Sequence, residues 1–144
     1  MALLEMMNKY LANQEVMYLK LHNLHWYIQG NSFFTLHGKF EELYDQTADM
    51  IDEVAERILA LGGMPVGSMK NALAQAAVKE LEDQPIDTAQ ALHQLITDVE
   101  YWIKDTGAIM QQAQQDGDDV TADIFTGYLK AYQKLLWMLK AYSK

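Results

Sequence analysis

The sequence predicts an all-α fold, a four-helix bundle with a long connection between its second and third helices. Apolar residues recur at steps of three and four residues through four long stretches, which is the helical period. Both prolines lie between the second and third stretches. No stretch alternates convincingly between apolar and polar residues, as a half-buried strand does. A chain of 144 residues has room for one such domain, which we place at residues 1–144.

Two long helices are predicted in the first half of the chain. The first covers about Leu3–Ile28, where the apolar residues keep helical spacing. Gly30 interrupts the pattern, and Asn31 or Ser32 can cap the helix that follows. The second helix covers about Phe33–Leu61 and ends at a Gly-Gly pair, which is a typical C-terminal stop.

The second half is predicted to hold the long connection and two further helices. The connection, Gly62–Asp87, has room for a short helix within Ser68–Val78. Asp87 is placed to cap the third long helix, which ends at Gly117. The fourth carries apolar residues at helical spacing through Ile124–Leu139. A single long crossover of this kind is the ferritin-like arrangement.

The composition excludes several function classes. The chain has 11 Lys and Arg against 20 Asp and Glu, a formal charge of −9, which argues against a protein that grips phosphate backbones. It has no cysteine, and therefore no disulfide, thiolate zinc site or Fe–S cluster. No run approaches the ~18 uncharged apolar residues of a membrane span. The N-terminal segment lacks the pattern of a signal peptide, so we expect a cytoplasmic protein.

The acidic residues are concentrated in the second predicted helix. No Lys or Arg lies between Lys39 and Arg57. Like charges four residues apart on a helix repel by roughly a few tenths of a kcal/mol, and an ordinary solvated face would interleave bases. The face is therefore either an unusually acidic solvated surface or one that binds cations. The seven acids of this stretch are Glu41, Glu42, Asp45, Asp49, Asp52, Glu53 and Glu56.

Two pairs of side chains on this helix have the spacing of metal ligands. His37 and Glu41 lie one helical turn apart, as do Asp52 and Glu56, so the members of each pair share a face. Carboxylate with imidazole suits iron or manganese better than calcium. The two pairs are about 22 Å apart along a helix, too far to share one ion. Two copies packed antiparallel about a two-fold axis would bring each pair opposite the other and make two equal sites.

Three segments carry a family resemblance. They are the stretch LHWYIQGNSFFTLHGKFEELYDQTADMIDEVAERILALGG, the segment GDDVTAD and the last helix with its tryptophan. Through them essentially the whole chain resembles the Dps-like miniferritins, small relatives of the ferritins named for DNA protection in starved cells. The resemblance implies a hollow homododecamer of ferritin-like bundles, with a short extra helix in the long connection. The Glu-x-x-His motif of single-chain di-iron bundles is absent.

The resemblance also implies an iron-storage and detoxification protein with ferroxidase activity. Fe(II) would be oxidised, preferably by hydrogen peroxide, and Fe(III) would be stored as mineral in the cage, protecting the cell from oxidative damage. Trp26 would donate an electron or trap a radical, or would only fill the interface. Many relatives carry Asp where this chain has Glu41. The implied ligands of the two-fold di-iron site are His25, His37 and Glu41 of one subunit, with Asp52 and Glu56 of its neighbour.

Other residues have weaker assignments. The resemblance places Asp119 and Asp123 at three-fold pores that would draw Fe(II) inward, and Asp119 could instead cap the last helix. We interpret His22 as a surface or interface histidine, and Trp102 and Trp137 as core residues. Three acids would nucleate mineral on the inner wall, or would belong to a solvated face: Glu42, Asp45 and Asp49.

DNA binding is the alternative function, as in a nucleoid protein of the same family. Relatives that condense DNA usually carry a flexible basic tail. Here Lys9 is the only base in the first 19 residues. At the other end Lys140 and Lys144 are few charges against a formal −9 per chain. We therefore predict no direct DNA binding at physiological salt. A further alternative is an inert cage in which the acidic helix is only a subunit contact.

Overall fold

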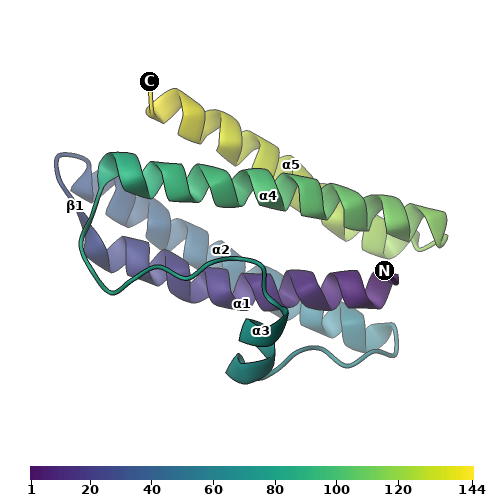
Figure 1. Cartoon of the computed structure of the whole chain (residues 1–144). Helices are drawn as coiled ribbons and strands as arrows, with labels where there is room; N and C mark the ends of the chain where they lie inside the picture. Colours follow the sequence, from purple (N-terminus) through teal and green to yellow (C-terminus); the bar gives the residue numbers. More distant parts are fainter. The chain divides into compact units, whose positions relative to one another are not determined.

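The computed structural model describes residues 1–144 as five α-helices and two very short strands (Figure 1). The chain divides into two compact units, Met1–Ala91 and Leu92–Lys144. The first unit holds α1 (Leu3–Tyr27), β1 (Ile28–Gln29), α2 (Phe33–Ala60), α3 (Met69–Gln75) and β2 (Ile86–Asp87). Helix α4 (Thr88–Gln115) begins in the first unit and continues in the second, which also holds α5 (Asp119–Tyr142). None of these helices combines the length and apolarity needed to cross a membrane.

Helices α1 and α2 run antiparallel and side by side within the first unit (Figure 1). Gly30 lies in the turn between them at φ +118°, a conformation that glycine adopts without strain. Both helices bury apolar side chains completely, which removes that surface from water and holds the pair together. The fully buried side chains include Met7, Leu24, Phe40 and Ile58.

The C-terminal end of α2 is closed by the glycine pair, as predicted. Gly62 has φ +85°, and the Gly63 N–H donates to the Ile58 carbonyl at 2.9 Å, which satisfies an otherwise free carbonyl of the last turn. A Cβ at Gly63 would lie 3.0 Å from Ile58 and 3.1 Å from Leu4. Both positions therefore need glycine, one for its backbone conformation and one for space.

Side chains from α1 hold the long connection in place. The Asn13 side-chain oxygen accepts hydrogen bonds from the backbone N–H groups of Ala77 and Val78, at 2.6 and 3.1 Å. The Asn8 amide bonds the same segment nearer its start, accepting from Val66 N–H at 2.9 Å and donating to the Met64 carbonyl at 3.0 Å. The predicted short helix is present as α3.

Strands β1 and β2 pair in parallel, with Ile28 opposite Ile86 and Gln29 opposite Asp87. Neither strand was predicted, since two residues each are too few to show alternation. Directly afterwards the Asp87 carboxylate accepts from the Gln90 backbone N–H at 2.8 Å. This contact confirms Asp87 as the cap of α4.

In the second unit, Gly117 has φ +72° and separates α4 from α5. The cap of α5 is Asp118, whose carboxylate accepts from the Thr121 N–H at 3.0 Å and from the Thr121 hydroxyl at 2.6 Å. The prediction of Asp119 as the cap is therefore wrong by one residue. Asp119 instead lies in the first turn and is exposed.

The two tryptophans of this unit differ in burial. Trp102 is 2% exposed and stacks on Tyr132, with ring centroids 6.5 Å apart, so its core assignment is confirmed. Trp137 is 68% exposed, and its assignment to the core is wrong. Met138 and Tyr142 are exposed on the same helix end. The residues one helical turn from Trp137 include Gln133, Lys134 and Lys140, so Trp137 lies on a mostly polar face of α5.

Candidate metal centre

Two histidines from neighbouring helices form the centre of the candidate site. His25, near the end of α1, is only 6% exposed, and its ring stacks on that of His37 of α2 with centroids 3.6 Å apart. Nδ1 of His25 lies 2.7 Å from the His37 carbonyl oxygen, and Nδ1 of His37 lies 2.6 Å from the His25 carbonyl oxygen. A carbonyl can only accept, so each Nδ1 carries the proton. Each neutral ring therefore keeps the Nε2 lone pair for a metal ion.

Glu41 joins this histidine pair. One of its carboxylate oxygens lies 3.8 Å from Nε2 of His25, and the side chain is 56% exposed. The carboxylate is placed one helical turn after His37, as the spacing predicts. Three of the predicted ligands, two imidazoles and one carboxylate, thus come together at one end of the α1–α2 pair.

Asp52 and Glu56 form a separate acidic pair further along α2, and both are exposed. The pKa of Glu56 is raised above its ordinary value because its side chain hydrogen-bonds to Asp52 and is repelled by the Asp52 charge. The two negative charges therefore disfavour each other, and a cation bound between them would relieve that repulsion.

The two groups do not meet within one chain. No set of three or more His, Asp or Glu side chains is positioned to hold one ion. Since α2 is one continuous helix, the midpoints of the two groups are about 22 Å apart at 1.5 Å per residue. Each chain therefore carries two separate groups of predicted ligands on α2 and the end of α1.

Several aromatic side chains surround the histidine pair that sequence reasoning did not assign to the site. Tyr44 stacks on His22 with centroids 3.8 Å apart and meets His25 edge-on at 5.3 Å. Partial burial, followed by the nearby carboxylates of Glu41 and Asp45, raises the pKa of the Tyr44 hydroxyl. The sequence did contain a signal for Tyr44, because it follows the predicted ligand Glu41 by three residues on α2.

Trp26 lies beside His22 rather than against the stacked rings of His25 and His37. It is 61% exposed, and its ring lies 5.3 Å from that of His22. His22 itself bonds through Nδ1 to the Tyr18 carbonyl of the preceding turn at 2.8 Å. The exposed face of Trp26 leaves room for a partner chain.

The remaining acidic candidates lie on helix surfaces. Asp119 and Asp123 are exposed on the first turns of α5. Glu42 pairs with Lys39 at 3.3 Å, so one of the three nucleation candidates has a basic neighbour. All seven acids of the α2 stretch are exposed: Glu41, Glu42, Asp45, Asp49, Asp52, Glu53 and Glu56.

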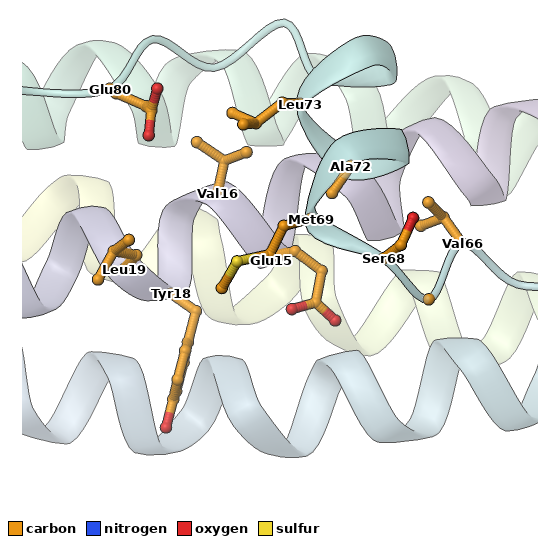
Figure 2. Close-up of a pocket in the computed structure, with 11 residues that line it drawn as sticks. Glu15, Val16, Tyr18, Leu19, Val66, Ser68, Met69, Ala72, Leu73 and Glu80 are labelled. Carbon is orange, nitrogen blue, oxygen red and sulfur yellow. The ribbon is translucent and has the colours of Figure 1, made fainter.

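A largely apolar groove of about 390 Å³ lies between α1 and the segment around α3 (Figure 2). Val16 and Leu73 face this space, whereas Tyr18 extends from α1 toward α2. Leu19 and Met69, which also line it, are 53% and 81% exposed.

Comparison with known proteins places this chain in a family. Residues 4–144 match the ferritin family, described as a ferritin-like domain. General stress protein 20U of Bacillus subtilis is 45% identical over 141 residues, covering 97% of this chain and 96% of the relative. DNA protection during starvation protein 2 of Bacillus anthracis is 42% identical over 140 residues, covering 96% and 94%. The crystal structure of Dps from Staphylococcus aureus matches with a TM-score of 0.95 at 41% identity, covering 99% and 95%.

The fold is thus ferritin-like, a four-helix bundle with a short extra helix in the long connection, as the sequence predicts. Within that class, the chain belongs to the Dps family of miniferritins.

Proposed function

We propose that this protein stores and detoxifies iron, as a ferroxidase whose sites form between two subunits. Membership of the ferritin-like Dps family supports iron storage and protection against oxidative damage. The observation that carries the finer proposal is the separation of the ligands into two half-sites on one helix. His25, His37 and Glu41 form one half, and Asp52 and Glu56 form the other.

A two-fold axis between antiparallel copies of α2 would complete the site. It would place His37 opposite Glu56 and Glu41 opposite Asp52 of the neighbouring subunit, and residue numbers sum to 93 in both pairs. Both pairings therefore follow from one register, and an isologous dimer makes two equal sites. Exposed apolar side chains at Trp26 and in the α1–α3 groove support burial by a second copy. We propose that six such dimers form the hollow homododecamer implied by the family.

The ligand chemistry suits iron. Unprotonated Nε2 atoms and carboxylates together favour iron or manganese. Because protons compete with the metal for the Nε2 atoms, affinity for the metal should fall at acidic pH. A cation bound at the acidic half would relieve the repulsion between the carboxylates of Asp52 and Glu56.

The proposed reaction is 2 Fe(II) + H₂O₂ + 2 H⁺ giving 2 Fe(III) + 2 H₂O. Each Fe(II) loses one electron, and the O–O bond of the peroxide breaks with release of two waters. Oxidation of a pair avoids the hydroxyl radical that a lone Fe(II) would release. The protein holds the two ions together, and Trp26 would supply an electron or trap a radical when the pair is incomplete.

Further parts of the cage follow from the same proposal. Asp119 and Asp123 would attract Fe(II) at three-fold pores, and Glu42, Asp45 and Asp49 would help mineral to form inside. Both compact units would act together as one domain over residues 1–144, since the family match spans nearly all of them.

We propose that this chain does not bind DNA directly, although relatives are named for DNA protection. The formal charge of the chain is −9. A duplex would be repelled at physiological salt. Protection of DNA would then come from removal of Fe(II) and peroxide.

The test is the rate of Fe(II) oxidation by hydrogen peroxide, followed by absorbance. We expect the Asp52→Ala/Glu56→Ala variant to lose most of this rate. The Glu82→Ala/Asp83→Ala variant removes the same charge from the exposed connection and should keep it. Equal rates in the wild type and the Asp52→Ala/Glu56→Ala variant would refute the assignment of the site.

A further inference from the structure

The paired imidazoles belong to a longer stack of aromatic rings that starts at the first residue of α2. Phe33 lies against His37, with centroids 4.8 Å apart and ring planes 20° from parallel. His37 in turn lies on His25 at 3.6 Å and 12°. Tyr44 contacts His25 edge-on at 5.3 Å. The two imidazoles are thus held between Phe33 and Tyr44.

Hydrogen bonds alone do not fix the direction of the free ring nitrogens. Each imidazole has one bond through Nδ1, to the carbonyl of the other histidine. The ring is attached to the backbone only through Cβ, so one hydrogen bond limits its rotation but still permits small changes in χ1 and χ2, which move the Nε2 atom at its outer end. A flat group against the ring face limits these changes. Such supporting contacts around a metal ligand typically matter about 10–100-fold in affinity.

We propose that Phe33 is a positioning residue for the metal-binding histidines. Its ring holds His37 parallel to His25, so that both Nε2 atoms are presented together to a metal ion. The inference rests on the proposed function. The contact is built into α2, because Phe33 lies one turn before His37. Its neighbour Phe34 is 88% exposed and makes no ring contact with either histidine.

The experiment measures binding of Co(II) alone, by titration of visible absorbance with the assembled protein. Co(II) takes imidazole and carboxylate ligands and is not oxidised during the titration. Its binding is therefore measured separately from ferroxidase activity. We expect Phe33→Leu, which keeps an apolar side chain but loses the flat face, to weaken binding about 10-fold. Phe33→Met, also apolar and flexible, repeats the measurement should the first variant assemble poorly. Phe33→Tyr keeps the flat face and should bind within about two-fold of wild type.

A matched control separates positioning from general stability. Phe40 is on the same helix, is fully buried and is not among the rings that contact His25 or His37. Phe40→Leu should lower the thermal midpoint at least as much as Phe33→Leu and leave Co(II) affinity unchanged. The inference is overturned if Phe33→Leu and Phe33→Met bind like wild type, if Phe33→Tyr binds as weakly as they do, or if Phe40→Leu weakens binding equally.

Failure of the proposed function would look different. In that case wild type and the Asp52→Ala/Glu56→Ala variant would bind Co(II) with the same affinity. If that variant loses binding while all Phe33 variants keep it, the two-subunit site stands and only the role of Phe33 is rejected.

Discussion

Glu15 lies in the α1–α3 groove, where burial raises its pKa above the ordinary value of 4.5. The folded protein therefore holds this proton more tightly than the unfolded chain. Stability is unaffected below the unfolded pKa and falls as the pH rises through the folded pKa, because the carboxylate must then ionise in the groove. We expect Glu15→Gln to raise the thermal midpoint at pH 7, with the difference from wild type shrinking toward pH 4.

The control for this prediction is Glu5→Gln, which removes the same charge from an exposed position at the start of α1. The thermal midpoint of Glu5→Gln should stay close to that of wild type at both pH 7 and pH 4. A Glu15→Gln variant that is less stable than wild type at pH 7 would show that the ionised carboxylate makes a favourable contact in the groove.

At the same scale, the sequence could identify candidate ligands but not how they are held. His37, Glu41, Asp52 and Glu56 are recognisable because one helical turn separates the members of each pair. The reciprocal bonds of His25 and His37 join residues 12 apart across two helices. No spacing rule reports such a contact, which depends on the antiparallel packing of α1 and α2.

At the scale of secondary-structure elements, Asn13 holds the long connection between α2 and α4 in place. Its side chain is fully buried and satisfies two backbone N–H groups, those of Ala77 and Val78. Asn13→Ala would leave both donors without this partner, at a cost of about 2–3 kcal/mol in the free energy of unfolding. Chemical denaturation measures this loss, and limited proteolysis should then cut the connection sooner.

Asn8 provides the comparison, because it makes equivalent bonds to the same connection at a more exposed position. Water can replace the lost hydrogen-bond partner at that position. Asn8→Ala should therefore lower the free energy of unfolding by less, about 1 kcal/mol or below. If the two variants lose equal stability, burial is not what makes the Asn13 contact important.

Predictions for whole elements succeeded where local chemistry decides the structure. The Asp87 cap, the glycine stop after α2 and the short helix α3 all follow from residues close together in the chain. The core assignment of Trp137 failed because its neighbours one helical turn away, among them Lys134 and Lys140, are polar, and the residue lies on the exposed face of α5. The cap of α5 was displaced by one residue since Asp118 and Asp119 are both suitable caps.

For the whole molecule, the proposed dimer register can be tested independently of metal. Phe34 and Leu59 are 88% and 58% exposed on the acidic face of α2, and their numbers also sum to 93. They should therefore face each other across the two-fold axis. The chain has no cysteine of its own. We expect Phe34→Cys/Leu59→Cys to form covalent dimers with a short bismaleimide cross-linker, seen on a denaturing gel.

A single cysteine tests whether the register is specific. Leu59→Cys alone changes the same helix, but the two cysteines of a dimer would lie about 37 Å apart along the axis in the proposed register. It should give few covalent dimers. Equal cross-linking of both variants would contradict the register.

The central claim is that each metal site takes ligands from two subunits, and mixing two inactive variants tests it most directly. One variant is His25→Ala/His37→Ala, and the other is Asp52→Ala/Glu56→Ala. In a mixed dimer one site has every wild-type ligand and the other site has lost both halves. With random pairing half the dimers are mixed, so about one quarter of all sites should be intact.

The measurement is Fe(II) oxidation by hydrogen peroxide after the two variants are unfolded, mixed in equal amounts and reassembled. Each variant reassembled alone should be nearly inactive. The account predicts that the mixture recovers about one quarter of the wild-type rate. A mixture of assembled protein as inactive as its two components would contradict a site shared between subunits.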